Sequence, residues 1–162
     1  MNTRTALLCA ALALTGCHSL PDAPASQAHA AAVSTDKAAR NKANALAFYE
    51  LAFNRYQVRE AADKYIGSEY LQHNPLVADG KEAFVQALSS YTAKFPRSKG
   101  HIKRVIAEGD LVMLHIHRQA EPGTRGRAVV DIFRFDGQGK IVEHWDVAQD
   151  VPETTVSGRS IF

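Results

Sequence analysis

The sequence predicts an α+β fold in which three helices pack on one face of an antiparallel sheet of four or more strands. In the first half of the folded region, apolar residues recur every three or four positions, as they do along one side of a helix. In the second half the period changes to two, and two short glycine-containing segments divide the strands into hairpins. Helices followed by a run of strands are typical of an α+β domain.

The first 16 residues are predicted to be a signal peptide. Arg4 precedes an apolar run, residues 6–14, that is too short to cross a bilayer as a helix. The segment LTGC, which ends at Cys17, resembles the lipobox of bacterial lipoproteins, in which the cysteine receives the lipid and becomes the mature N-terminus. An ordinary secretory signal followed by a chance cysteine is the alternative.

Lipidation of Cys17 would decide where the mature protein resides. Cys9 lies in the removed segment, so the mature chain would keep one lipid-bearing cysteine and no disulfide. His18, in place of aspartate, resembles the pattern of Gram-negative lipoproteins that are sent to the outer membrane. We therefore expect a cell-envelope protein that faces the periplasm and contacts the outer membrane only through this lipid.

Residues 17–35 are rich in Ala, Ser and Pro without an apolar period, which predicts a flexible tether. Residues 36–162 are enough for one domain with a hydrophobic core. The whole chain has 19 Lys and Arg against 17 Asp and Glu, and no basic block stands out. A nucleic-acid partner is therefore not expected.

The first of the three helices is expected within residues 36–57. Its buried stripe consists of residues at three- and four-residue steps: Leu46, Tyr49, Phe53 and Tyr56. A second, short helix is expected over residues 58–66.

The segment SEYLQHNP then reads as extended and stops at Pro75. The third helix begins after it, where Asp79 as N-cap and Glu82 three residues later predict a capping box. Its apolar face is Phe84, Leu88, Tyr91 and Phe95, and Pro96 ends it.

Two hairpins account for the predicted sheet. Residues 101–120 form the first, around a turn at 108–110, and residues 126–149 form the second, around a loop at 136–139. If that loop has four residues, Asp131 pairs with His144 and Asp146 lies diagonally across from Asp131. A longer or bulged loop would weaken this pairing.

Alternation along the second hairpin places its three titratable groups on one face of the sheet. The apolar residues expected on that face are Val129, Phe133, Phe135 and Val142. The opposite face is expected to hold Val130, Ile132, Arg134, Ile141, Glu143, Trp145 and Val147.

Two carboxylates and an imidazole among apolar side chains have a natural chemical use. In such surroundings one group can act as a base while a neighbour stays protonated and donates a hydrogen bond. The alternative is a solvent-facing pair of Asp131 and His144, worth less than about 1 kcal/mol.

The arrangement of elements and several segments are similar to the SnoaL-like polyketide cyclases of the nuclear-transport-factor-2-like superfamily, and most of all to its branch of predicted aldol-condensation-catalysing enzymes. The segments YLQHNP, ADGKEAF and AVVDIFRFDGQGKIVEHWDVAQDVPE carry the resemblance, which covers residues 38–162. The resemblance implies a cone-shaped, curved sheet wrapped by helices around one apolar pocket. It also implies that no cofactor is needed and that a homodimer forms through the outer surface of the sheet.

In characterised SnoaL-like cyclases, an aspartate near the end of the last strand removes a proton next to a carbonyl, and a histidine one strand earlier assists. The resemblance makes Asp146 the candidate base, but the earlier strand offers Asp131 instead of histidine. Either His144 supplies the imidazole or this branch performs different chemistry. A protonated Asp131 or His144 would donate a hydrogen bond to the enolate oxygen.

Further residues are candidates for binding. Substrate contacts are expected from His73, Asn74, Phe133 and His117. His115 and His117 alternate on one strand face and could hold a metal together with His73 or Asp131, although a half-exposed polar face is the preferred interpretation and no metal is expected. The closing segment SGRSIF is expected to fold Ile161 and Phe162 over a sheet edge or the pocket mouth.

Two functions remain open from the sequence. The first is a cofactor-free general-base enzyme, of aldol, cyclase or isomerase type, acting on a small apolar carbonyl compound. The second is a non-catalytic lipoprotein that binds a hydrophobic small molecule in the same pocket. The lipid anchor favours the second, because polyketide assembly is cytoplasmic, whereas the titratable cluster in VVDIF and EHWDV favours the first.

Overall fold

The structure is a computed structural model, and it describes residues 25–162. The predicted signal peptide, the lipidation site at Cys17 and the start of the predicted tether lie outside the described residues. None of the described helices combines the length and the hydropathy that crossing a bilayer requires.

Helices come first in the described chain and most of the strands follow, which confirms the predicted α+β class. The helices are α1 (Ala25–Tyr49), the π-helical turn η1 (Glu50–Asn54), α2 (Val58–Tyr65) and α3 (Lys81–Lys94). The strands are β1 (Ile66–Gln72), β2 (Lys99–Glu108), β3 (Leu111–Gln119), β4 (Arg127–Phe135) and β5 (Ile141–Asp150).

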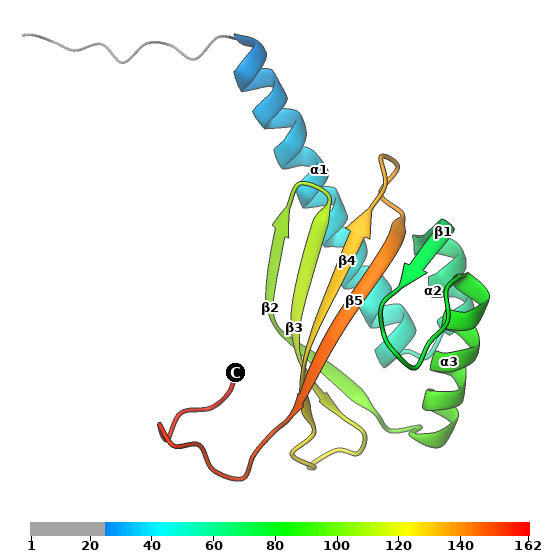
Figure 1. Cartoon of the computed structure of the whole chain (residues 1–162), viewed down its shortest axis with the longest axis vertical. Coiled ribbons are helices and arrows are strands. Elements are labelled where there is room, and N and C mark those ends of the chain that lie inside the picture. The colour runs from blue at the N-terminus through cyan, green and yellow to red at the C-terminus, as the bar shows by residue number, and fades with distance from the viewer. Residues whose placement is uncertain (1–24) are drawn as a thin grey trace, which may run out of the picture.

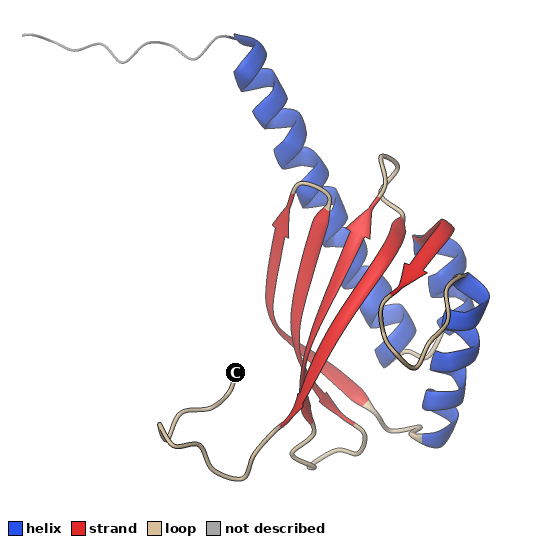
Figure 2. Cartoon of the chain, viewed as in Figure 1, coloured by secondary structure: helices blue, strands red, loops and turns tan. Residues whose placement is uncertain are grey.

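The five strands form one open, strongly twisted sheet in the order β1-β5-β4-β3-β2. The two predicted hairpins are present as β2–β3 and β4–β5, both antiparallel. The sheet is not wholly antiparallel, however, because β1 pairs with β5 in parallel at one edge. The described helices gather on one side of the sheet (Figure 2), so they cover one face of the sheet and leave the other uncovered by helices.

Helix α1 begins earlier than expected, because it already runs through residues 25–35, the end of the predicted tether. Five of residues 25–34 are alanine, which has the highest helix propensity of all residues. A composition that suits a flexible linker can therefore also form a helix. The first turns of α1 project beyond the sheet in Figure 1.

The core lies between α1, η1 and the covered face of the sheet. Tyr49 of the predicted stripe is fully buried, and Phe53 packs against the core. Phe48 is also fully buried, and its ring contacts Phe133 of β4 at 5.6 Å between centroids. Aromatic contacts of this kind join the helical layer to the sheet.

The predicted capping box of α3 is wrong. Its N-cap is Gly80, and no side chain caps the helix. Asp79 instead accepts a hydrogen bond from the backbone N–H of Gln72 at 2.7 Å, and Glu82 pairs with Arg59 of α2 at 2.6 Å. Both acidic side chains therefore tie α3 and its preceding loop to neighbouring elements.

The predicted register of the second hairpin is also wrong, because the loop is one residue longer than expected and β5 contains a bulge. Asp131 lies opposite Asp146, and Phe133 lies opposite His144. Between Arg134 and Phe135 the register shifts, so that Phe135 faces Ile141. An extra residue in one strand rotates the side chains beyond it to the other face, so Ile141 is buried in the core in the place expected for Val142.

Gly100, at the start of β2, is expected to resist substitution. Its backbone N–H and C=O are both bonded by the Asn54 amide, at 2.9 and 3.1 Å. A Cβ at this position would overlap the Tyr49 hydroxyl and lie 2.7 Å from the ring carbon Cε1 of the same residue. Because Tyr49 is fully buried, we expect Gly100→Ala to lower the free energy of unfolding by about 1–3 kcal/mol in urea denaturation.

The matched control for that change is Gly137→Ala, since a Cβ at Gly137 meets no atom within 4 Å. We expect this control to shift stability by less than about 0.5 kcal/mol. Equal stability of the two variants would show that Tyr49 can move away from the β2 backbone without cost, which would contradict the predicted overlap.

Candidate functional site

A cavity of about 410 Å³ lies between the covered face of the sheet and the helices. Its walls carry the aromatic residues Phe48, Phe53, Tyr70, Phe84, Tyr91 and Phe133. Its polar residues are Gln72, Asn74, Arg118, Asp131, His144 and Asp146. A larger hollow of about 910 Å³ over α2 has exposed charged side chains as half of its lining residues, so the aromatic cavity is the better candidate site.

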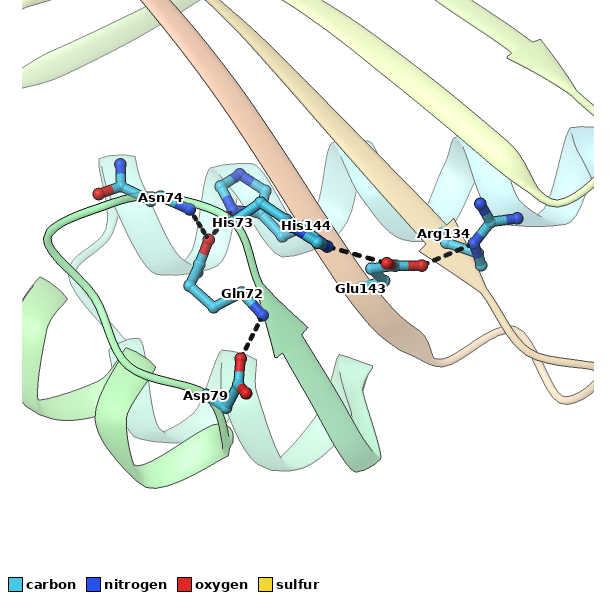
Figure 3. A network of polar contacts seen from close by, with 7 residues as sticks. All are labelled: Gln72, His73, Asn74, Asp79, Arg134, Glu143 and His144. Carbon is cyan, nitrogen blue, oxygen red and sulfur yellow. Dashed lines mark hydrogen bonds and ion pairs between the residues drawn. The ribbon is translucent and has the colours of Figure 1, made fainter.

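Gln72 fixes the orientation of the His144 ring. The Gln72 side-chain oxygen accepts a hydrogen bond from the backbone N–H of Asn74 at 2.9 Å, so this end of the amide is the acceptor. The same oxygen lies 2.8 Å from Nδ1 of His144 (Figure 3). Nδ1 must therefore carry a proton and donate it to Gln72.

His144 and Asp131 consequently share one proton. Nε2 of His144 lies 3.1 Å from Oδ1 of Asp131. Since Nδ1 is already a donor, the contact requires either an imidazolium that donates to a carboxylate or a carboxylic acid that donates to a neutral imidazole. With exposed fractions of 5% and 8%, Asp131 and His144 are shielded from water, so the cross-strand pair on a solvent face is excluded.

Asp146 is held as a hydrogen-bond acceptor beside this pair. The Asn74 side-chain oxygen accepts from the backbone N–H of Leu76 at 2.9 Å, which turns the amide nitrogen toward Asp146. That nitrogen lies 3.0 and 2.8 Å from the two carboxylate oxygens of Asp146. The polar end of the cavity thus combines an accepting carboxylate with a neighbouring pair that holds one proton.

The structure brings five of the predicted site residues to this cavity: Asp131, His144, Asp146, Asn74 and Phe133. The Phe133 ring stacks on the His144 ring with centroids 5.1 Å apart. The other two predicted substrate contacts, His73 and His117, do not line the cavity. Both side chains alternate along their segments with residues that face the cavity, which places them on the opposite side of the sheet.

His73 lies on the uncovered side of the sheet. Its ring stacks on Trp145 of β5, with centroids 4.8 Å apart and planes within 5°. Its Nε2 lies 2.9 Å from Oε1 of Glu143, whose other oxygen accepts from Arg134 at 2.8 Å (Figure 3). Hydrogen bonds from His73 and Arg134 hold the pKa of Glu143 below its ordinary value.

This lowered pKa predicts a pH-dependent contribution to stability. A carboxylate whose pKa is lower in the folded chain stabilises the fold above its unfolded pKa, and that stabilisation is lost as the pH falls through the folded pKa. We expect Glu143→Gln to have a lower Tm than the parent protein at pH 7, and the difference to shrink below about pH 4. Glu153→Gln, which removes a carboxylate from an exposed ion pair, is the control and should leave Tm unchanged at each pH.

His115 and His117 also lie on the uncovered side, where the C-terminal tail reaches them. The Phe162 ring lies 4.6 Å from the His117 ring and 5.5 Å from the His115 ring, between centroids. The tail therefore crosses the outer face of the sheet, not the pocket mouth. Among the described residues the two histidines belong to no cluster of three metal-ligating groups.

Asp131, His144 and Asp146 are the three groups whose ligand atoms lie near enough to hold a metal, within 4.8 Å of one another in the described chain. A cation there would have to displace the hydrogen bond between His144 and Asp131. It would also compete with the Asn74 amide for both oxygens of Asp146. The hydrogen-bonded arrangement fits a shared proton better than a metal ion.

Two residues of the cavity were missed from the sequence. Tyr70, Gln72 and Asn74 lie two residues apart and all line the cavity. In the segment QHNP, Gln72 and Asn74 therefore face inward and His73 faces outward. Arg118 likewise lies at a two-residue step from Leu114 and Ile116, which are both fully buried, so it shares their face of β3. The two-residue period of these strands therefore predicts that Gln72 and Arg118 face the cavity, whereas the neighbouring histidines face away from it.

Comparison with known proteins gives a consistent result. A family model for SnoaL-like polyketide cyclases matches residues 43–154. No protein of curated function matches the sequence at a significant level.

Similar solved structures include a protein from Acidithiobacillus ferrooxidans provisionally assigned as a polyketide cyclase, with 21% identity and a TM-score of 0.58, covering 68% of this chain and 88% of that one. A nuclear-transport-factor-2-like protein of unknown function from Mesorhizobium loti has 19% identity and a TM-score of 0.58, covering 70% and 93%. A provisionally assigned SnoaL-like isomerase from Agrobacterium tumefaciens has 14% identity and a TM-score of 0.55, covering 70% and 98%. At these identities the likeness establishes the fold.

Proposed function

The chain belongs to the family of SnoaL-like polyketide cyclases, and from this premise we propose that it is a cofactor-free enzyme that removes a proton next to the carbonyl of a small apolar compound. The observation that carries the proposal is the polar end of the cavity. There, Asp146 is an acceptor and the pair of His144 and Asp131 holds one proton. These are the two roles that enolisation requires.

In the proposed reaction, Asp146 takes the α-proton of the substrate and the C–H electrons move toward the carbonyl oxygen. The shared proton of His144 and Asp131 is donated in a hydrogen bond to the enolate oxygen that forms. A hydrogen bond aimed at developing charge in a water-poor site is worth a few kcal/mol. The enolate then either takes the proton back at another carbon, which is isomerisation, or attacks a second carbonyl, which is aldol cyclisation.

The shared first step can be tested without knowing the natural substrate. In D₂O, the protein should exchange the α-protons of an activated apolar ketone, such as 2-tetralone, faster than buffer alone does, as measured by proton NMR. A further probe, an apolar β-keto ester, covers substrates with more acidic protons. The enzyme proposal fails if neither compound exchanges faster than it does in buffer.

Two further proposals concern how the protein is anchored and how it assembles. We propose that Cys17 carries a lipid that holds the chain at the outer membrane facing the periplasm, which mass spectrometry of the membrane fraction tests. We also propose a homodimer through the uncovered sheet face, where Ile106 and Val147 are exposed. A monomer mass in light scattering at micromolar concentration would overturn the dimer.

The second candidate function is a lipoprotein that holds a hydrophobic ligand without turnover, which the LTGC segment and the aromatic walls favour. Saturable binding of 2-tetralone without exchange of its protons would support this alternative.

A further inference from the structure

Arg118 is the one arginine or lysine among the described side chains that line the cavity. It extends from the covered face of β3 toward the helices. Its guanidinium carbon lies 4.4 Å from the ring centroid of Phe53, 5.3 Å from that of Tyr91 and 5.9 Å from that of Tyr49. Contacts of this kind hold a guanidinium in place through the faces of the rings.

The charge of Arg118 has no carboxylate partner among the described residues. Six other arginines do form ion pairs with acidic side chains: Arg55, Arg59, Arg97, Arg125, Arg127 and Arg134. Burial raises the pKa of Tyr49 and so keeps this neighbouring phenol neutral. Asp131 acts on Arg118 through its charge, but no acidic side chain of the described residues lies within ion-pair distance of the guanidinium. A ligand carboxylate would supply that missing direct partner.

Arg118 and the proton-transfer groups belong to opposite ends of the cavity. In the sheet, Leu114 pairs with Asp131, whereas Arg118 lies four residues further along β3. Four residues of a strand span about 13 Å, and the long arginine side chain shortens this gap. Aromatic walls separate the two ends, with Phe53 near Arg118 and Phe133 near His144.

We propose that Arg118 binds the carboxylate of a planar, ring-containing keto acid whose reacting carbonyl lies at Asp131, His144 and Asp146. The inference rests on the proposed function for the place of the carbonyl and extends it by naming the substrate class. The Asp146 carboxylate at the reacting end repels an anion, while Arg118 attracts it, so the charge sets one orientation of the ligand.

The test compares two probes of the same shape, 2-naphthoate and 2-naphthamide, by isothermal titration calorimetry with the purified protein. Charge-assisted hydrogen bonds to a guanidinium predict that naphthoate binds about 10- to 100-fold more tightly than naphthamide. Equal affinities, or failure of both probes to bind, would overturn the proposal without any variant having to fold.

Variants then assign the preference to Arg118. Arg118→Met should reduce naphthoate binding to the level of naphthamide, and Arg118→Lys should keep part of the preference. Arg97→Met, which removes the same charge from an exposed ion pair, should bind both probes as the parent does. A naphthoate preference that survives in Arg118→Met would contradict the assignment.

The outcome is distinguishable from that of the proposed function because the assay needs no turnover. If naphthoate binds through Arg118 but the protein exchanges no α-protons, the carboxylate site is supported and the proposed enzymatic activity is overturned. If the protein exchanges α-protons but does not prefer naphthoate, the enzymatic activity is supported and the carboxylate site at Arg118 is overturned.

Discussion

Replacing Asp146 with Asn is expected to lower the rate of 2-tetralone proton exchange by about 10²- to 10⁴-fold, the usual contribution of a general base. The amide has nearly the shape of the carboxylate, and its oxygen can still accept from Asn74, so the cavity should keep its form. The amide cannot take up a proton, however. The loss should therefore appear in the exchange rate, while Tm and the affinity for the ketone change little.

Asp150→Asn provides the matched control, because it makes the same change on the same strand. Asp150 is exposed and pairs with Arg127 at 3.0 Å, away from the cavity. Its replacement should leave exchange within about twofold of the parent rate. A similar loss in both variants, or none in Asp146→Asn, would remove Asp146 from the role of base.

Truncation of Phe48 to alanine should have the largest effect on stability, a loss of about 3–5 kcal/mol in the free energy of unfolding. Phe48 is fully buried, and its ring meets those of Phe84 at 5.5 Å and Phe133 at 5.6 Å. Removal of the ring would leave a void between helix and sheet that neither layer can close without moving. Urea denaturation measures the loss.

The control for this truncation is Leu76→Ala, which removes a large apolar side chain that is 90% exposed. It should cost less than about 0.5 kcal/mol. A loss in Phe48→Ala no greater than that of the control would mean that the layers are not joined through this aromatic contact.

The fold class and the two hairpins could be predicted because they depend on local periodicity. Alternation alone also placed Asp131, His144 and Asp146 on one face of the sheet, and the structure shows that this is the covered face. The cross-strand pairing could not be predicted in this way. It depends on the length of the loop and on a bulge near Val142, and neither leaves a signal in the apolar pattern.

Long-range contacts account for the remaining differences. The parallel pairing of β1 with β5 joins segments about 70 residues apart along the chain, so no turn marks it, yet it brings Gln72 next to His144. Asp79 has the sequence of a helix cap but bonds the end of β1 instead. In both cases tertiary partners decide between local options that the sequence leaves equally open.

The central claim is that the polar end of the cavity holds a carbonyl compound with its acidic carbon at Asp146. A crystal structure of the protein with 2-naphthol, a stable planar analogue of the 2-tetralone enol, tests it most directly. The account predicts the naphthol oxygen within hydrogen-bond distance of Asp131 or His144, and the adjacent ring carbon about 3–3.5 Å from an Asp146 oxygen. Naphthol bound with its oxygen toward another part of the cavity, or only outside the cavity, would contradict it.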